Sequence, residues 1–272
     1  MKVAITGSSG LIGTALRESY EGDGHTVVRL PRQVEDVDGV DVVVNLAGAG
    51  IGARRWTASY REVILRSRVD TTTSLAAAIA RARRPPKALL SASGVSYYGD
   101  RSDEVLTESS VGGTGFLPSV VREWESAAVA DIPVCHLRFG LVLSEAGGVL
   151  GQLLPFFRAG LGARFGSGRQ FWSWISLVDA VRAIRQLPGA QGPYNVTAPE
   201  PVRNIEFTRA LASALGRPAV LRAPGWSLRL ALGGVAGDAL DSLRVLPDRL
   251  VEAGFRFEHG TVAAALEPLR TR

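Results

Sequence analysis

Short apolar runs alternate with amphipathic helical stretches through the first two thirds of the chain. The runs fall at residues 2–6, 26–30, 41–47, 87–93 and 133–139, with a further run at 192–197. Between them, apolar residues at helical spacing mark the stretches 11–20, 60–82 and 119–130. Continuous apolar strands separated by helices are typical of a parallel sheet that is covered on both faces. The pattern therefore predicts an α/β protein built on a doubly wound parallel sheet.

The pattern becomes looser after Gly140, where glycines fall among aromatic residues and prolines. A helix is expected at 203–215, and the tail that follows is typical of several short helices. We therefore expect a nucleotide-binding domain at 1–165, to which 175–200 returns, and a smaller, mostly helical substrate or partner lobe at 166–272. Open α/β sheets bind ligands at the carboxyl ends of their strands, so a cleft between the two parts would lie there.

Composition excludes several classes of protein. Of the 272 residues, 46% are apolar and 21% charged, which is the balance of a globular protein. No apolar run approaches the roughly 20 residues of a membrane-spanning helix, so no membrane partner is expected. The first residues begin a strand without a signal-peptide pattern, and we therefore expect a cytoplasmic protein.

The charged and metal-binding residue types exclude further classes of function. The net charge of +5 comes mainly from arginines scattered among acids, which argues against a nucleic-acid surface. Cys135 is the only cysteine, and the three histidines stand in no metal-ligand pattern, so we predict no metal. A small-molecule substrate is expected. The oligomeric state stays open, with a homodimer as one alternative.

A glycine-rich turn, TGSSGLIG at residues 6–13, joins the first strand to the first helix. Its glycines allow a tight turn, a close approach of backbone to a pyrophosphate, and close packing of the helix on the sheet. The N-terminus of the helix adds N–H groups and a positive dipole end. This context predicts a Rossmann-type dinucleotide site. The predicted contacts are Gly7, Ser9, Gly10, Leu11, Ile12 and Gly13.

The residues after the second strand indicate which dinucleotide is bound. Folds of this type place an acid there for the ribose of NAD, or an arginine for the 2′-phosphate of NADP. Arg32 stands just past the strand end, with no acid before Glu35. Because guanidinium matches phosphate bidentately, we predict NADP rather than NAD, with Arg32 as a contact. The alternative is that Arg32 is a solvated loop charge.

The segments TGSSGLIG, NLAG (45–48) and SASGVSYYGD (91–100) together resemble the extended short-chain dehydrogenases of the NAD-dependent epimerase/dehydratase superfamily. The segments GSGRQFWSWI (166–175) and VLPDRLVEAGFRF (245–257) are similar to an atypical epimerase-family subgroup. Members of this subgroup end in a small helical domain of unknown function. The resemblance is collinear and covers essentially the whole chain.

This resemblance implies further cofactor contacts. The NLAG segment would pass under the adenosine and phosphates, one helical arginine would face the cofactor, and the residues after the strand at 133–139 would border the nicotinamide. The implied contacts are Leu46, Ala47, Gly48, Arg68, Ser91, Ala92, Phe139 and Gly140. One departure is that only ten residues, 33–42, follow the adenine-side loop before the NLAG strand, so any additional strand there must be vestigial.

Family members that transfer hydride use a Tyr-x-x-x-Lys pair on one helix face, where the lysine and the oxidised nicotinamide lower the tyrosine's pKa from about 10. Here the only lysines are Lys2 and Lys87, and no tyrosine has a lysine four residues on. The helix that would carry the pair corresponds to residues 115–125, which contain neither residue type. The standard pair is therefore absent.

Three hypotheses remain for the chemistry. In the first, Ser93 with Tyr97 or Tyr98 forms a rearranged acid/base site, with Ser93 and Tyr97 as the best candidates. In the second, a carboxylate handles the proton, the candidates being Asp103, Glu104 and Glu108. In the third there is no turnover, and the protein is a non-catalytic NADP(H)-binding sensor or regulator. Each residue also has a structural alternative, as a cap, a packed aromatic or a solvated acid.

The segment 166–175 combines planar donors with flat apolar rings, which suits a planar or anionic small molecule. Its tentative substrate residues are Arg169, Trp172 and Trp174. The alternative is that the tryptophans seal the junction between the two lobes. The leading hypothesis is an NADP-dependent oxidoreductase or isomerase of the atypical short-chain type, acting on an unidentified small molecule.

Overall fold

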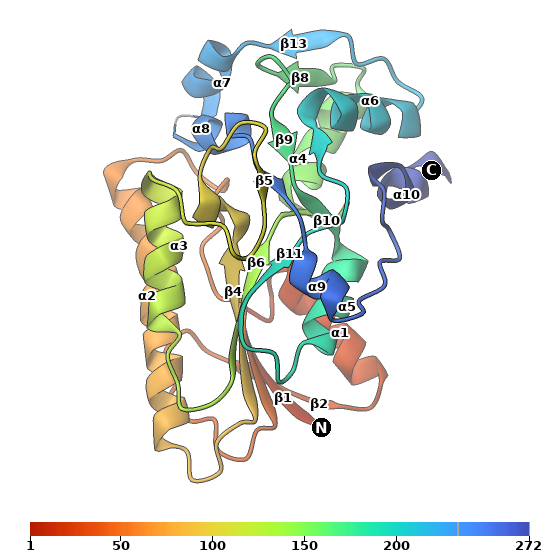
Figure 1. Cartoon of the computed structure of the whole chain (residues 1–272). Helices are drawn as coiled ribbons and strands as arrows, with labels where there is room; N and C mark the ends of the chain where they lie inside the picture. The colour runs from red at the N-terminus through yellow and green to blue at the C-terminus, as the bar shows by residue number, and fades with distance from the viewer. Residues whose placement is uncertain (233, 272) are drawn as a thin grey trace.

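The chain folds around a six-stranded sheet (Figure 1). The computed structural model describes residues 1–232 and 234–271. The strand order is β11-β6-β4-β3-β1-β2, and every neighbouring pair is parallel. The strands are β1 (Lys2–Thr6), β2 (Thr26–Leu30), β3 (Val42–Asn45), β4 (Ala88–Gly94), β6 (Val134–Phe139) and β11 (Gly192–Val196). The predicted doubly wound α/β fold is confirmed.

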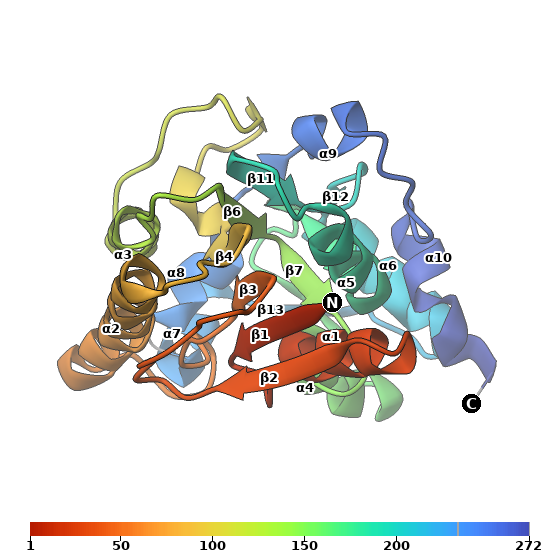
Figure 2. The ribbon, with the colours of Figure 1, turned by 90° about the horizontal axis from the view of Figure 1, so that it is seen from below.

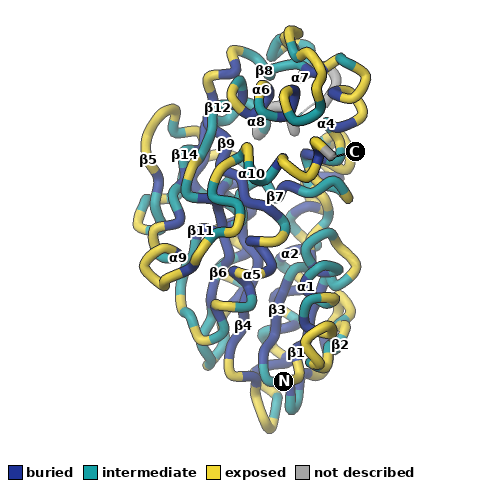
Figure 3. Tube along the Cα trace, turned by 90° about the vertical axis from the view of Figure 1, so that its right-hand side faces the viewer, coloured by how far each residue is buried: buried dark blue, intermediate teal, exposed yellow. Residues whose placement is uncertain are grey.

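Helices cover both faces of this sheet (Figure 2). One face carries α1 (Leu11–Gly22) and α5 (Leu177–Gln186), and the other carries α2 (Ala58–Arg81) and α3 (Phe116–Ala127). The central strands are consequently buried from both sides, as the dark blue tube of β3 and β4 shows (Figure 3). Double burial is the physical reason that these strands are continuous apolar runs rather than alternating ones.

The connection from β2 to β3 is short, and in the described chain residues 31–41 form no strand. Val34, Val37 and Val40 instead join the core between α2 and the sheet. The prediction of a vestigial segment here is confirmed. β2 is one of the two edge strands of the sheet, and Arg32 lies just outside it with an exposed side chain.

A smaller lobe lies over the carboxyl ends of the strands (Figure 1). Its elements are α4 (Gly148–Arg158), β8 (Ala163–Phe165), β9 (Phe171–Trp172), β12 (Val202–Arg203), α6 (Asn204–Ala214), β13 (Leu221–Ala223), α7 (Gly225–Leu232) and α8 (Val235–Leu240). β7 (Leu141–Leu143) and β10 (Trp174–Ser176) pair in parallel and contribute side chains to the cores of both parts. The lobe therefore packs onto the carboxyl edge of the sheet, where the turns after the strands lie.

The tail returns along both parts of the molecule. β14 (Arg244–Val245) pairs with β5 (Val105–Leu106), and α9 (Asp248–Glu252) contacts β11. α10 (Val262–Leu266) packs on α6, and the 3-10 helix η2 (Glu267–Thr271) follows it. The tail thus consists of short elements, as its sequence predicts, and it ties the lobe to β11 and to the segment after β4.

Candidate functional site

The glycine turn between β1 and α1 is built so tightly that side chains are excluded. Gly7 has a φ of +66°, and a Cβ placed on it would lie 2.6 Å from the carbonyl oxygen of Leu46. A Cβ on Gly13 would overlap the carbonyl oxygen of Gly7. Within the described chain no side chain caps α1 at Gly10, and its first turn holds no acid. The helix therefore offers its N–H groups and positive dipole end to an external anion.

Asn45 holds the ends of three strands and one helix together. It is fully buried, accepts a hydrogen bond from Thr6 Oγ1 (2.6 Å), and donates to Thr72 Oγ1 (2.8 Å) and Ser91 Oγ (3.2 Å). The network fixes the chain where residues 46–48 pass beside Gly7. Sequence reasoning missed Asn45, although a lone amide at the end of a buried apolar strand was a usable signal. Ser91 is directed into this network.

Arg68 is a buried cation beside Gly48. It is 7% exposed, and its Nη1 donates to the carbonyl of Ile64 (2.9 Å). Its guanidinium carbon lies 5.1 Å from the ring centroid of Trp124, and a Cβ on Gly48 would lie 3.1 Å from that carbon. Burial lowers the pKa of Arg68 to about 10. Within residues 1–232 and 234–271 no carboxylate forms an ion pair with it, so this arginine lacks the counter-charge that a buried cation needs.

The two catalytic candidates contact the same buried ion pair. Arg138 donates to both carboxylate oxygens of Glu125, each at 2.8 Å. Ser93 Oγ donates to Glu125 Oε1 (2.5 Å), and the guanidinium carbon of Arg138 lies 3.5 Å from the ring centroid of Tyr97. Burial alone would raise the pKa of Glu125, but the hydrogen bonds and charge of Arg138 outweigh burial and lower it. Sequence reasoning did not anticipate this pair.

The two adjacent tyrosines differ in what their hydroxyls can do. Tyr98 is fully buried; its hydroxyl donates to Asn195 Oδ1 (2.8 Å) and accepts from Arg138 Nη1 (3.1 Å). Burial raises the pKa of Tyr98. Tyr97 is only partly buried, and a Cβ on Gly112 would lie 3.2 Å from its hydroxyl oxygen. Of the two, only Tyr97 keeps part of its surface exposed.

The three carboxylate candidates fall into different surroundings. Asp103 pairs with Arg203 (2.9 Å) and Glu104 with Arg101 (2.7 Å), and both acids are exposed. Glu108 is partly buried, and its Oε1 accepts the N–H of Asn195 (3.0 Å). Burial raises the pKa of Glu108, and its Oε2 is buried with no partner among the described residues. Only Glu108 is therefore perturbed in the way that proton-transfer groups are.

The tentative substrate residues are separated by the fold. Trp172 and Trp174 are 6% and 0% exposed and belong to the core of the smaller lobe. Their indole N–H groups donate to the carbonyls of Ala239 (3.3 Å) and Glu200 (2.9 Å). A buried indole offers no face to a ligand, so the structure does not place these rings where the substrate hypothesis needs them. Arg169 is exposed on the loop before β9.

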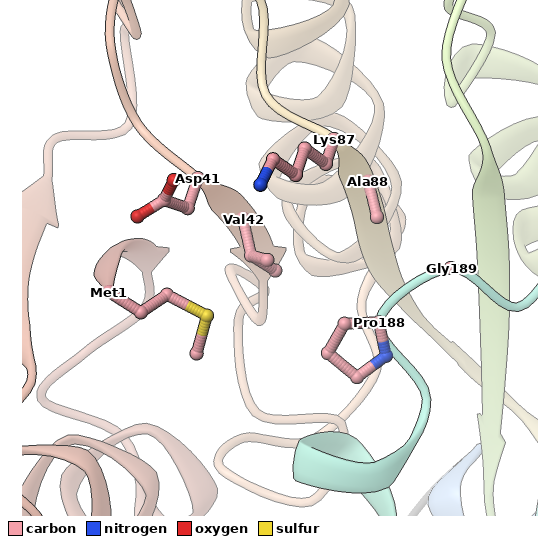
Figure 4. A pocket seen from close by; sticks show the side chains of 7 residues that line it. All are labelled: Met1, Asp41, Val42, Lys87, Ala88, Pro188 and Gly189. Atoms are coloured by element: carbon pink, nitrogen blue, oxygen red, sulfur yellow. The ribbon is translucent and has the colours of Figure 1, made fainter.

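One surface hollow of about 570 Å³ lies at the opposite edge of the sheet (Figure 4). Asp41, Val42, Lys87 and Ala88 line it at the amino ends of β3 and β4. None of the predicted site residues lies in it, and parallel sheets bind cofactors at the other edge.

No helix in the described part of the chain is long and apolar enough to cross a membrane.

Residues 3–196, the sheet with its glycine turn, match the model of the NAD dependent epimerase/dehydratase family. The chain belongs to this family. Residues 223–269 match a model described as a domain of unknown function, so the epimerase-family subgroup with such a C-terminal domain is confirmed. The buried Arg68 and the tight glycine turn are thus features of an epimerase-family chain.

Relatives that combine both parts are similar over nearly their full length. An epimerase family protein of Mycobacterium bovis, Mb2239, is 41% identical over 296 residues, which cover 99% of this chain and 98% of the relative. The epimerase family protein SDR39U1 of Bos taurus is 36% identical, covering 98% and 99%. A crystal structure of human SDR39U1 with NADPH superposes with a TM-score of 0.96 at 32% identity, covering 100% of this chain and 99% of that one.

Proposed function

We propose that this chain binds NADP(H) at the carboxyl edge of its sheet and acts as an atypical short-chain dehydrogenase-type oxidoreductase or isomerase on a small molecule. The observation that carries the proposal is Arg68, a buried cation without a carboxylate partner in the described chain, beside Gly48. A dinucleotide phosphate would supply the missing negative charge. The proposal includes a cytoplasmic location, which remains a prediction from the sequence.

The residues at this edge fit a dinucleotide. The N–H groups that begin α1 would bind the pyrophosphate, because Gly7, Gly10 and Gly13 allow backbone to approach it. Residues 46–48 would pass under the adenosine side, and Arg32, exposed after β2, would contact the 2′-phosphate. The human relative crystallised with NADPH supports NADP over NAD.

The chemistry would take place where β4 and β6 end. The bound cofactor supplies a nicotinamide that accepts or donates hydride. Phe139 ends β6 at this edge and Gly140 follows it, and Gly94 is in register with Phe139. Tyr97, partly buried against Arg138, would supply its hydroxyl for the substrate's proton, and Ser93 orients Glu125 by a hydrogen bond. Arg138 would then be the cation beside the reacting tyrosine in a chain that lacks the Tyr-x-x-x-Lys pair.

The cofactor half of the proposal is tested by titrating the purified protein with NADPH and NADH and recording reduced-nicotinamide fluorescence. The wild-type protein is expected to bind NADPH more tightly than NADH. Arg68→Met should weaken NADPH binding by about tenfold or more, because a charge-assisted contact is lost. Arg66→Met on the same helix is the control, since Arg66 is exposed and pairs with Glu62. Equal binding by both variants and wild type would contradict the assignment of Arg68.

A second candidate function is the non-catalytic NADP(H) sensor. It is favoured by the engagement of the Ser93 and Tyr98 hydroxyls in internal hydrogen bonds. The two functions are distinguished by incubating the protein with NADP(H) and a fractionated metabolite extract. Nicotinamide absorbance detects net oxidation or reduction, and chromatography of the metabolites also detects isomerisation, which leaves the cofactor unchanged. An enzyme gives turnover that Tyr97→Phe abolishes while NADPH binding stays. A sensor binds NADPH and gives no turnover in any fraction.

A further inference from the structure

The outer part of the smaller lobe carries a hollow of about 410 Å³ that none of the predicted site residues lines. One wall is α6, which presents Ile205, Thr208 and Arg209 at i, i+3 and i+4 and hence on one face. The opposite wall is the segment 219–221 leading into β13, and Arg164 of β8 completes the lining. The hollow therefore combines two guanidinium groups with an apolar side.

The charge around this hollow is strongly one-sided. Residues 201–223 contain four arginines and a single acid, Glu206, and of these arginines Arg203 pairs with Asp103 outside the stretch. Glu206 is already engaged, because its carboxylate accepts the backbone N–H of Arg203 (2.8 Å). Across the described ranges, neither Arg164 nor Arg209 forms an ion pair; Arg164 donates only weakly, to the carbonyl of Ser167 at 3.4 Å. Cationic groups that converge on a hollow without acids attract anions.

The pairing of β8 with β13 adds an independent observation. The two strands are parallel, and Arg222 stands in register with Arg164. Residues in register on neighbouring strands project to the same face about 5 Å apart. Like charges placed directly opposite each other destabilise a sheet, yet here the strand pair has two arginines at its centre. An anion bound beside them would relieve this repulsion.

The walls also indicate what else the ligand carries. Val220 is 87% exposed and Leu221 is 44% exposed, an unusual state for aliphatic side chains next to a hollow. Arg222 cannot swing freely, because its Nε donates to the carbonyl of Gly166 (2.8 Å). The ligand would therefore place its charged group between Arg164 and Arg209 and its apolar part against residues 219–221.

We propose that this hollow is a second ligand site, separate from the carboxyl edge, which binds a small molecule with a phosphate or carboxylate group and an apolar portion. The proposal does not depend on the proposed function. Its probe is phenyl phosphate, titrated by isothermal calorimetry into wild type, into R164Q/R209Q, and into R83Q/R256Q. Arg83 and Arg256 are exposed and line neither this hollow nor the carboxyl edge. The control pair therefore removes the same charge elsewhere.

Wild type is expected to bind phenyl phosphate in the millimolar range or tighter. R164Q/R209Q should weaken binding by about tenfold or more, and R83Q/R256Q by less than about twofold. The melting temperature of R164Q/R209Q should not fall, because replacing Arg164 removes its repulsion of Arg222 on the neighbouring strand. NADPH titration of the same variants should be unchanged, which separates this site from the cofactor site.

Several results would overturn the proposal. One is the absence of binding by wild type, and another is an equal loss in the two double variants, since either would leave only unspecific attraction of anions. A third is binding to vesicles that contain phosphatidylglycerol without binding of phenyl phosphate, because the basic surface would then dock a membrane. A lower melting temperature of R164Q/R209Q together with unchanged phenyl phosphate affinity would make the arginines structural.

Discussion

The guanidinium carbon of Arg138 lies 3.5 Å from the centre of the Tyr97 ring. Glu125 holds the guanidinium in this position by two hydrogen bonds of 2.8 Å. A cation stacked on an aromatic face gains from the ring quadrupole, most of all where water is excluded. Arg138 is thus a cation next to Tyr97 in a chain that lacks the Tyr-x-x-x-Lys pair. Tyr97 lies in the 3-10 helix η1 (Val95–Tyr98), Glu125 in α3 and Arg138 in β6.

Glu125→Gln should destabilise the fold by about 3–5 kcal/mol, because it leaves the Arg138 charge buried without a counter-charge. The side chains of Arg138 and Glu125 are only 5% and 13% exposed. The free energy of unfolding in urea measures the effect. Glu62→Gln is the matched control: its pair with Arg66 is 59% and 63% exposed, so the loss should stay below about 1 kcal/mol. Equal losses of unfolding free energy in the two variants would show that burial of the Arg138–Glu125 pair does not add to its effect on stability.

Gly7→Ala should abolish NADPH binding and cost roughly 2–5 kcal/mol of stability, because the new methyl meets the Leu46 carbonyl in a left-handed backbone. Fluorescence titration and urea unfolding measure the two effects. Gly24→Ala is the control: Gly24 has a φ of +76°, but a Cβ there meets nothing within 4 Å. Gly24→Ala should lower the free energy of unfolding by only about 1–2 kcal/mol and leave the affinity for NADPH unchanged. Unaltered NADPH binding by Gly7→Ala would mean that the turn does not hold the cofactor.

Arg32→Glu should shift the cofactor preference from NADPH towards NADH, because the carboxylate repels a 2′-phosphate and accepts a ribose hydroxyl. The ratio of the two dissociation constants, measured by fluorescence, should change by about tenfold or more. Arg29→Glu, an exposed change on β2, should alter the ratio far less. An unchanged ratio in Arg32→Glu would make Arg32 a solvated loop charge.

Glu108→Gln should change the pH dependence of stability. Burial raises the folded-state pKa of Glu108, so the carboxyl contributes stability below its ordinary value of about 4.3, and loses that contribution as pH rises through the raised pKa. The difference in unfolding free energy, wild type minus variant, should therefore fall as pH increases from about 4 to about 7. Glu104→Gln, exposed on the same loop, controls for the lost charge. A difference that rises with pH would show that Glu108 is stabilised as the carboxylate.

The apolar runs by themselves determined the parallel sheet, because strands buried on both faces must be apolar throughout. The glycine spacing likewise predicted the turn before α1, since Gly7 and Gly13 leave no space for side chains. The motif SASGVSYYGD indicated the family, and the missing lysine was plain from counting residues. These features are local, so each can be recognised within one continuous stretch of the sequence.

Tertiary structure alone decided which polar groups meet. Ser93, Glu125 and Arg138 are 32 and 13 residues apart along the chain, and only the register of β4 with β6 and the packing of α3 bring them together. Tertiary structure also decided the role of Trp174. Its segment has the residue types of a ligand site, but the core of the smaller lobe buries its ring. Side-chain chemistry is readable from sequence, whereas partners and burial depend on contacts between elements that no local pattern encodes.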